Sequence, residues 1–224
     1  MPQTAHRTAW LAGATGLVGG FLLRELLASE RYSAVIVLTR RAVKVEHPKL
    51  KQSLVDFDRL QALDLSPADD VFCALGTTIK KAGSQEAFRR VDLDYPRALA
   101  NKAVASGAKQ FLLVSSVGAN ARSSNFYLRT KGELEDALSE LPFQGAHIFR
   151  PSLLMGPRQE SRLGERVGAV LMKVLAPVLI GGLSRYRAIK AEDVARAMVS
   201  AAAREVSGKK VYEYEQLKAL LKQA

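Results

Sequence analysis

Cysteine, histidine and long apolar runs are all scarce in this sequence. Cys73 is the only cysteine, so no disulfide can form within the chain, and a reducing cytoplasm is the expected location. The three histidines, His6, His47 and His147, lie far apart and lack the spacing of metal ligands. We therefore expect neither a disulfide-stabilised fold nor a bound metal.

No apolar run is long enough to cross a bilayer. The most apolar window, residues 167–180, contains Lys173 and Pro177 and falls short of the ~20 residues that a membrane span needs. Residues 1–8 lead directly into a short apolar stretch and a glycine-rich turn, so the sequence predicts no export signal. The expectation is a protein without a membrane span.

Acidic residues are outnumbered: 33 lysines and arginines face 22 aspartates and glutamates, which leaves a formal net charge of +11. This excess favours anionic partners such as nucleotides, acidic substrates, nucleic acids or lipid headgroups. The sequence lacks zinc-finger spacing, an RNP-like aromatic pattern and a helix-turn-helix signature, so nucleic acid is the least expected partner. A small-molecule substrate is expected instead, and an acidic one is an open alternative.

Short apolar runs alternate with segments of helical periodicity over the first two thirds of the chain. Strands are predicted near 8–12, 33–39, 52–57, 70–75, 109–115 and 145–150. Helices are predicted near 17–29, 84–106 and 124–140, with a shorter one near 57–64. This β-α-β order predicts an α/β fold, a doubly wound parallel sheet of the Rossmann type.

Residues 1–224 are expected to form a single dinucleotide-binding domain, since no linker or repeat divides them. After Pro151 the pattern is less regular, and residues 151–224 are predicted to form a small region on the substrate side, acting as a lid. Within it we expect an apolar helix near 166–180, which could equally be a homodimer contact or core, an extended piece near 185–190, and helices near 192–204 and 214–222.

A glycine-rich loop follows the first predicted strand and opens the first predicted helix, which is the context that a dinucleotide-binding motif requires. Glycines permit a tight turn, and the helix start offers free N–H groups and a positive dipole to a pyrophosphate. The predicted cofactor-binding residues of this loop are Gly13, Thr15, Gly16, Leu17, Val18 and Gly19. The alternative is a glycine turn that serves only packing.

The second predicted strand ends with Thr39, Arg40 and Arg41, where an NAD-binding fold offers a carboxylate to the ribose 2′-hydroxyl. A carboxylate would repel the additional phosphate of NADP, whereas guanidinium groups bind it with charge-assisted hydrogen bonds. Arg40 and Arg41 therefore predict NADP(H) as the cofactor. The alternative is that both are solvated loop cations.

Tyr127 and Lys131 are separated by one helical turn, which places both side chains on one face of the predicted helix. The lysine charge would help the tyrosine hydroxyl to act as an acid toward a carbonyl oxygen. Ser116, at the end of the preceding strand, would hydrogen-bond the same oxygen, and Ser115 is the alternative serine. Ser116, Tyr127 and Lys131 are the predicted catalytic residues.

The YxxxK spacing alone is weak evidence, because Tyr186/Lys190 and Tyr214/Lys218 also match it. Only Tyr127 follows a serine-bearing strand end on the carboxyl side of the sheet, where ligands bind in open α/β folds. The alternative is that Tyr127 anchors its helix without taking part in chemistry.

The motifs GATGLVGG, LLVSSVGA, YLRTK and IFRPSLLMGPR resemble those of the short-chain dehydrogenase/reductases. Over residues 8–200 the chain is most similar to the atypical branch typified by the Tat-interacting-protein-like oxidoreductases. Three stretches have recognisable counterparts in that branch: VDLDYPRALANKAVASGAKQFLLVSS, SSNFYLRTKGELE and RPSLLMGPRQESRLGE. The resemblance implies the same three catalytic residues, with Tyr127 and Lys131 also contacting the cofactor.

The resemblance also implies where the rest of the cofactor lies. Asp56 and Phe57 would flank the adenine, and Leu75, Gly76 and Thr77 would lie along its middle. The segment from Pro151 to Leu154 would lie by the nicotinamide, and Arg162, within RQESR, would close over the site. From the residues alone, Asp56 could instead be a loop cap, and Arg158 and Arg162 surface cations.

Two features depart from the family pattern. Asp92 stands where many relatives carry a structural asparagine, and the interval from Ser116 to Tyr127 is short. Because of these departures, the residues of the proton relay and the choice between Ser115 and Ser116 stay open.

Two functions fit these observations. The first is an NADP(H)-dependent oxidoreductase that reduces a small carbonyl substrate by hydride transfer. The alternative is an NADPH-binding, redox-sensing regulatory or interaction protein without turnover, and a third, weaker hypothesis is polyanion binding through the net charge.

Overall fold

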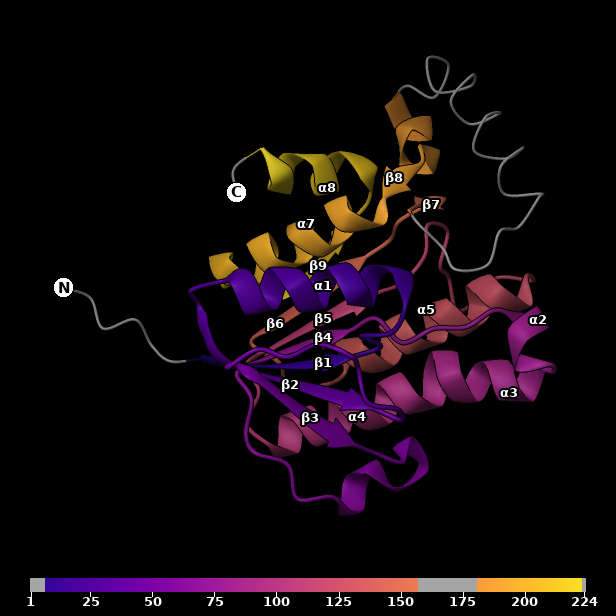
Figure 1. Cartoon of the computed structure of the whole chain (residues 1–224). Helices are drawn as coiled ribbons and strands as arrows, with labels where there is room; N and C mark the ends of the chain where they lie inside the picture. Colours follow the sequence, from indigo (N-terminus) through magenta and orange to yellow (C-terminus); the bar gives the residue numbers. More distant parts are fainter. Residues whose placement is uncertain (1–6, 157–180, 223–224) are drawn as a thin grey trace.

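The computed structural model describes residues 7–156 and 181–222, and within them it contains a large parallel sheet covered by helices on both faces (Figure 1). The strand order is β3-β2-β1-β4-β5-β6-β9, and all neighbouring pairs are parallel. The order reverses beside β1, which confirms the predicted doubly wound, Rossmann-type fold. The strands of this sheet are β1 (Arg7–Ala12), β2 (Tyr32–Thr39), β3 (Leu50–Leu54), β4 (Asp70–Cys73), β5 (Gln110–Val114), β6 (Gly145–Phe149) and β9 (Gly208–Tyr212). A small second sheet pairs β7 (Leu154–Met155) with β8 (Ile189–Lys190).

The helices divide between the two faces of the large sheet (Figure 1). One face carries α1 (Leu17–Ala28), α7 (Ala191–Arg204) and α8 (Tyr214–Leu221), and α7 packs against both of the others. The other face carries the helices α3 (Gln85–Arg89), α4 (Tyr95–Ala105) and α5 (Phe126–Ser139) with the 3-10 helix η1 (Phe57–Ala62) and the π-helical turn η2 (Arg90–Asp94). The short helices α2 (Ile79–Ala82) and η3 (Gly181–Tyr186) lie at the edges of this arrangement.

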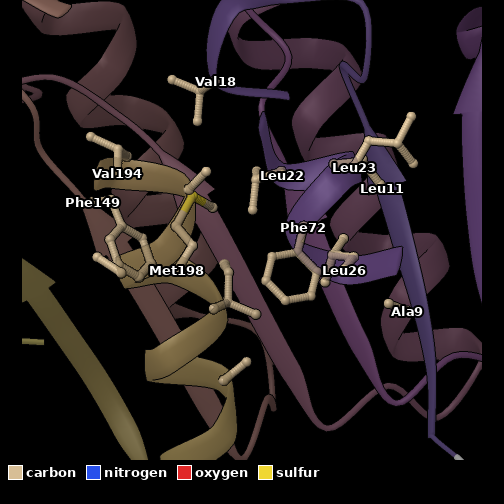
Figure 2. Packing of buried hydrophobic residues seen from close by; sticks show 14 of the residues in the cluster. Ala9, Leu11, Val18, Leu22, Leu23, Leu26, Phe72, Phe149, Val194 and Met198 are labelled. Atoms are coloured by element: carbon tan, nitrogen blue, oxygen red, sulfur yellow. The ribbon is translucent and has the colours of Figure 1, made fainter. Parts of the chain in front are cut away.

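The alternation of side chains along β1 supplies both cores, as expected for a sheet that is buried on two faces. Leu11 joins the core beneath α1 and α7, whereas Trp10 joins the core on the opposite face. In Figure 2, Leu22 of α1 and Met198 of α7 lie around Phe72 of β4, and all three are fully buried. This packing therefore fixes α1 against the sheet, directly after the glycine loop that joins β1 to α1.

The short elements α2 and β7 were not predicted, and three further elements differ from the sequence-based prediction. β9 was not predicted, because four of its five residues, Gly208 to Val211, are exposed at the sheet edge and form no apolar run. The helix predicted at 84–106 is interrupted by the π-helical turn η2. The extended piece predicted at 185–190 is strand only at Ile189–Lys190, because the residues before it close the 3-10 helix η3.

The region after Pro151 has a double role. α7, β9 and α8 complete the large sheet and one of its helical layers. β7, η3 and β8 form a small unit beyond the carboxyl ends of the strands, and this unit contacts α7 and α8 (Figure 1). The expected apolar helix near 166–180 lies outside the described residues, as does Arg162. The substrate-side role of residues 151–224 stays a prediction.

A buried polar network joins the amino-terminal ends of the strands, at the edge opposite to the predicted site. Asp70 is fully buried and accepts hydrogen bonds from Arg7, Tyr32 and the Gln110 amide, the last at 2.7 Å. The Oε1 atom of Gln110 lies 3.1 Å from Nε2 of His147. Burial lowers the pKa of His147 to about 4, so this imidazole is neutral at pH 7.

The low pKa of His147 makes stability depend on pH in a defined window. An unfolded histidine titrates at about 6.5, so between that pH and about 4 the unfolded chain binds a proton that the folded chain does not. The stability is complete above the upper value and is lost as the pH falls. We expect the melting temperature of the wild type to fall more steeply across this window than that of His147→Gln. Parallel pH dependences in the two proteins would contradict this assignment.

Candidate functional site

The glycines of the loop between β1 and α1 are fixed by close backbone contacts. Gly13 has φ +91°, and a Cβ there would lie 2.4 Å from the carbonyl oxygen of Ala74. A Cβ on Gly19 would lie 1.9 Å from the carbonyl oxygen of Gly13. The Gly16 N–H donates to that same Gly13 oxygen at 2.9 Å. The loop is thus pressed between the end of β4 and the start of α1, and larger residues do not fit.

The start of α1 is open to an anion. Its N-cap is Gly16, which has no side chain that could cap the helix, and its first turn has no acidic residue. Thr15 and Gly16 are exposed, so the unpaired N–H groups of the first turn face outward from the core. Val18 is buried in the core, so only its backbone can meet a ligand. The geometry fits the pyrophosphate of a dinucleotide.

Arg40 and Arg41 lie directly after β2, and both are exposed. Their turn is held by Thr39, whose buried hydroxyl donates to the Arg41 carbonyl at 2.7 Å. Burial and the hydrogen bond to Asp58 raise the pKa of Tyr95, against the opposing charges of Arg90 and Arg40. Arg90 and Arg40 thus both act on Tyr95, although Arg90 lies in the π-helical turn η2, about 50 positions further along the chain.

The two residues predicted near the adenine differ in exposure. Asp56 is exposed and caps η1, since its side chain accepts a hydrogen bond from the Asp58 N–H at 3.0 Å. Phe57 is buried, and its ring stacks on Tyr95 with centroids 5.4 Å apart. The Phe57 ring is therefore part of the core, and only its backbone is available to an adenine.

Leu75, Gly76 and Thr77 follow the carboxyl end of β4, beside the glycine loop. Gly76 is exposed, and the Thr77 N–H donates to Oδ2 of Asp92 at 2.8 Å. A Cβ on Gly76 would lie 3.4 Å from Oδ1 of Asp92 and 4.0 Å from Nζ of Lys131. This short segment therefore connects the cofactor loop with the predicted catalytic lysine.

The two candidate serines after β5 have different environments. Ser115 is buried and donates a short hydrogen bond to Glu135, a buried carboxylate that also pairs with Arg150. Ser116 is half-buried, and its hydroxyl makes one long contact, 3.4 Å to the Val117 carbonyl. The Ser115 hydroxyl thus ties β5 to α5, while the Ser116 hydroxyl is the one that a ligand can reach.

Tyr127 and Lys131 lie on α5, whose first turn is capped by Asn125. Tyr127 is half-buried and packs against Phe88, with ring centroids 5.7 Å apart. Lys131 is buried, and its Nζ lies 2.8 Å from Oδ1 of Asp92. Burial lowers the pKa of Lys131, but its interactions with Asp92, Tyr127 and Cys73 together raise the pKa above its usual value, so the side chain is an ammonium.

Gly132 lets α5 approach the loop after Ser116, but it was not among the site residues predicted from the sequence. A Cβ there would lie 2.1 Å from the backbone nitrogen of Ala121, so α5 rests directly on the loop after Ser116. The Asn120 N–H also donates to the Leu128 carbonyl at 3.1 Å. The only signal was a glycine inside a helical pattern, which often marks close backbone approach.

The segment predicted near the nicotinamide lies next to this loop. The Pro151 carbonyl accepts from the Val117 N–H at 3.0 Å, and Leu154 pairs with Ile189 in the small sheet. A Cβ on Gly156 would lie 2.9 Å from the side chain of Leu17, so this segment passes over the start of α1. The glycine loop, Ser116, Tyr127 and Lys131 all lie at the carboxyl edge of the sheet.

Comparison with known families agrees with this geometry. The sequence model of the NAD dependent epimerase/dehydratase family matches residues 9–214. The chain belongs to this family. Protein HTATIP2 of Rattus norvegicus is 41% identical over 167 residues, which cover 71% of this chain and 68% of that protein. Together these matches confirm the resemblance to the atypical short-chain dehydrogenase/reductases.

Solved structures of other proteins have a similar fold. Human epimerase family protein SDR39U1, determined with NADPH, has a TM-score of 0.63 at 19% identity and covers 92% of this chain and 74% of its own. MoeE5, determined with UDP-glucose and NAD, has a TM-score of 0.68 at 17% identity and covers 97% and 82%. These likenesses establish the fold, and one of the two proteins was determined with NADPH and the other with NAD.

The expected cytoplasmic location is contradicted by the curated relatives. Protein FMP52 of Candida albicans, which is named as mitochondrial, is 33% identical over 208 residues and covers 90% of both chains. FMP52 proteins of Lodderomyces elongisporus and Meyerozyma guilliermondii carry the same designation. A single cysteine was too weak a basis for assigning a compartment. Within the described ranges, no helix combines the length and hydropathy needed to cross a membrane.

Proposed function

We propose that this protein binds NADP(H) and reduces a small carbonyl compound, with Tyr127, Lys131 and Ser116 as the catalytic residues. The observation that carries the proposal is their convergence with the glycine loop at the carboxyl edge of the sheet, where open α/β folds bind ligands. NADPH, when bound, supplies the hydride.

The glycine loop fits the pyrophosphate, and the residues after β2 fit the 2′-phosphate. The uncapped first turn of α1 supplies N–H donors, and the close contacts of Gly13 and Gly19 leave no side chain in the way. Arg40 and Arg41 are exposed cations where NAD-binding folds carry a carboxylate. Their charge favours NADP(H) over NAD(H), and the NADPH complex of human SDR39U1 shows that the fold accommodates this dinucleotide.

The double variant Arg40→Asp/Arg41→Asp tests the cofactor assignment. Two charge-assisted hydrogen bonds contribute about 1.5–3 kcal/mol each, so we expect NADPH affinity to fall by about 100-fold or more. NADH affinity, measured by the same fluorescence titration, should change much less. Arg196→Asp/Arg204→Asp makes the same charge change on exposed positions of α7 and should leave both affinities unchanged. Equal losses for NADPH in the two double variants would contradict the assignment.

The proposed chemistry needs one proton at the substrate oxygen. Tyr127 is half-buried at the start of α5, so its hydroxyl can reach a ligand and act as the general acid. The Lys131 ammonium lies beside the Gly76–Thr77 backbone, where it can contact a ribose and hold its charge near the acid. Ser116 can orient the carbonyl oxygen, because its hydroxyl is not tied to Glu135 as that of Ser115 is.

A redox-sensing protein without turnover is the second candidate. A sensor would use the same NADP(H) site. The buried Asp92 beside Lys131 favours the sensor, because its carboxylate opposes the lysine charge that would assist the tyrosine acid. An assay of NADPH oxidation against a panel of small aldehydes and ketones separates the two. Turnover that depends on Tyr127 supports the enzyme, while tight NADPH binding without any oxidation supports the sensor.

A further inference from the structure

Arg90 is an exposed cation of the π-helical turn η2 that lies against η1. The turn runs directly into α4, and α4 packs against η1. The Arg90 side chain is 63% exposed, and its Nε lies 3.9 Å from Oδ1 of Asp58 in η1. This contact places an exposed arginine beside the segment that is predicted to flank the adenine.

Asp58 joins Arg90 to that segment through both its backbone and its side chain. The Asp58 N–H donates to the side chain of Asp56 at 3.0 Å. Oδ2 of Asp58 accepts from the Tyr95 hydroxyl at 3.1 Å, and the Tyr95 ring stacks on Phe57. Arg90 is therefore two contacts away from Asp56, at the rim of the predicted adenine site.

The same rim is tied to the end of β2, where the exposed Arg40 follows Thr39. The N–H of Val55, the residue before Asp56, donates to the Thr39 carbonyl at 2.9 Å. Burial and the hydrogen bond to Asp58 raise the pKa of Tyr95, and the charges of Arg90 and Arg40 both oppose that shift. The two arginines therefore border the same corner of the carboxyl edge of the sheet.

The Arg90 guanidinium has donors available for an anion. Among residues 7–156 and 181–222 its one ion pair is the 3.9 Å approach to Asp58, which is longer than a hydrogen bond. A guanidinium carries five N–H donors in a planar fork, and this fork matches a phosphate with two parallel hydrogen bonds. The loose contact with Asp58 leaves that fork free to bind one.

We propose that Arg90 is a specificity-determining residue that binds the 2′-phosphate of the adenosine together with Arg40 and Arg41. The exposed carboxylates of Asp56 and Asp58 at the same rim would repel that phosphate, and the charge of Arg90 offsets them. The proposal rests on the proposed function and deepens it, because it assigns a third cation, from a different element, to the group that distinguishes NADP(H) from NAD(H).

Arg90→Met tests the proposal with two fragments of the cofactor. The fragment 2′,5′-ADP carries the 2′-phosphate, whereas 5′-AMP is the same nucleotide without it, and neither contains the nicotinamide. Isothermal titration calorimetry gives the affinity of each fragment for the wild type and the variant. We expect 2′,5′-ADP to bind Arg90→Met about 10-fold more weakly or worse, because charge-assisted hydrogen bonds to the phosphate are lost. The affinity for 5′-AMP should stay as in the wild type.

Two further variants separate the role of Arg90 from general effects of charge and stability. Arg196→Met removes the same charge from an exposed position of α7 and should bind both fragments as the wild type does. Arg90→Lys keeps the charge but lacks the planar fork, so its affinity for 2′,5′-ADP should lie between those of the wild type and Arg90→Met. Because the Arg90 side chain is largely exposed, the melting temperature of Arg90→Met should stay near that of the wild type.

Equal affinities of 2′,5′-ADP for the wild type and Arg90→Met would overturn the proposal. An equal loss for 5′-AMP would overturn it as well, because it would show that Arg90 contacts the adenine and not the phosphate. Both results leave the NADP(H) assignment standing as long as the wild type prefers 2′,5′-ADP to 5′-AMP. A wild type without that preference would contradict the NADP(H) assignment itself, and this proposal with it.

Discussion

Tyr127→Phe should lower kcat for NADPH-dependent carbonyl reduction by about 100- to 10,000-fold, the usual contribution of a positioned general acid. The substitution removes only the hydroxyl, and the phenyl ring keeps its packing against Phe88. NADPH affinity should therefore change by no more than a few-fold. Steady-state kinetics and a separate titration of NADPH binding give the two values.

Tyr214→Phe is the control for this variant. Tyr214 and Lys218 have the same YxxxK spacing, but they lie on α8, in the outer part of the opposite helical layer (Figure 1). We expect its kcat to equal that of the wild type. Equal activity of Tyr127→Phe and wild type would remove the enzyme assignment, and NADPH binding without turnover in both would favour the sensor.

Gly19→Ala should abolish dinucleotide binding and destabilise the fold by about 3 kcal/mol or more, because the added methyl group would overlap the Gly13 backbone. The loop would have to move away from α1, and the N–H groups at the helix start would lose their arrangement. Thermal denaturation and an NADPH titration measure the two effects.

The neighbouring position provides a sharp comparison. A Cβ on Gly20 would lie 3.6 Å from the Ala14 carbonyl oxygen, an ordinary contact. Gly20→Ala should therefore bind NADPH normally and gain up to about 1 kcal/mol from the higher helix propensity of alanine. If Gly19→Ala and Gly20→Ala behaved alike, the close packing of the loop would not be what binding requires.

The fold was largely predictable because a parallel sheet buried on both faces imposes continuous apolar runs. The stretch that forms β2 is one of these, and it was placed within one residue of its start. β9 escaped because a strand at the sheet edge needs no apolar run: its lysines face solvent, and its position is set by pairing with β6. Pairing of that kind is a tertiary effect that local pattern does not encode.

The candidate site was predictable where chemistry depends on spacing along the chain. The glycine loop and the Tyr127/Lys131 pair are local motifs, and the structure brings both to one edge of the sheet. The partner of Lys131 was not predictable from spacing, because Asp92 lies in the π-helical turn η2 and Lys131 lies in α5. The choice between Ser115 and Ser116 likewise required the contact with Glu135, which only the packed structure shows.

The most direct test of the central claim, that this family member holds NADP(H) through its glycine loop and the cations after β2, is a competition experiment by native mass spectrometry. The protein is mixed with equal concentrations of NADPH and NADH, beside the Arg40→Asp/Arg41→Asp variant. We predict that the wild type carries one NADPH per chain in clear excess over NADH and that the variant loses this preference. A wild type that binds NADH equally well or better, or neither dinucleotide, would contradict it.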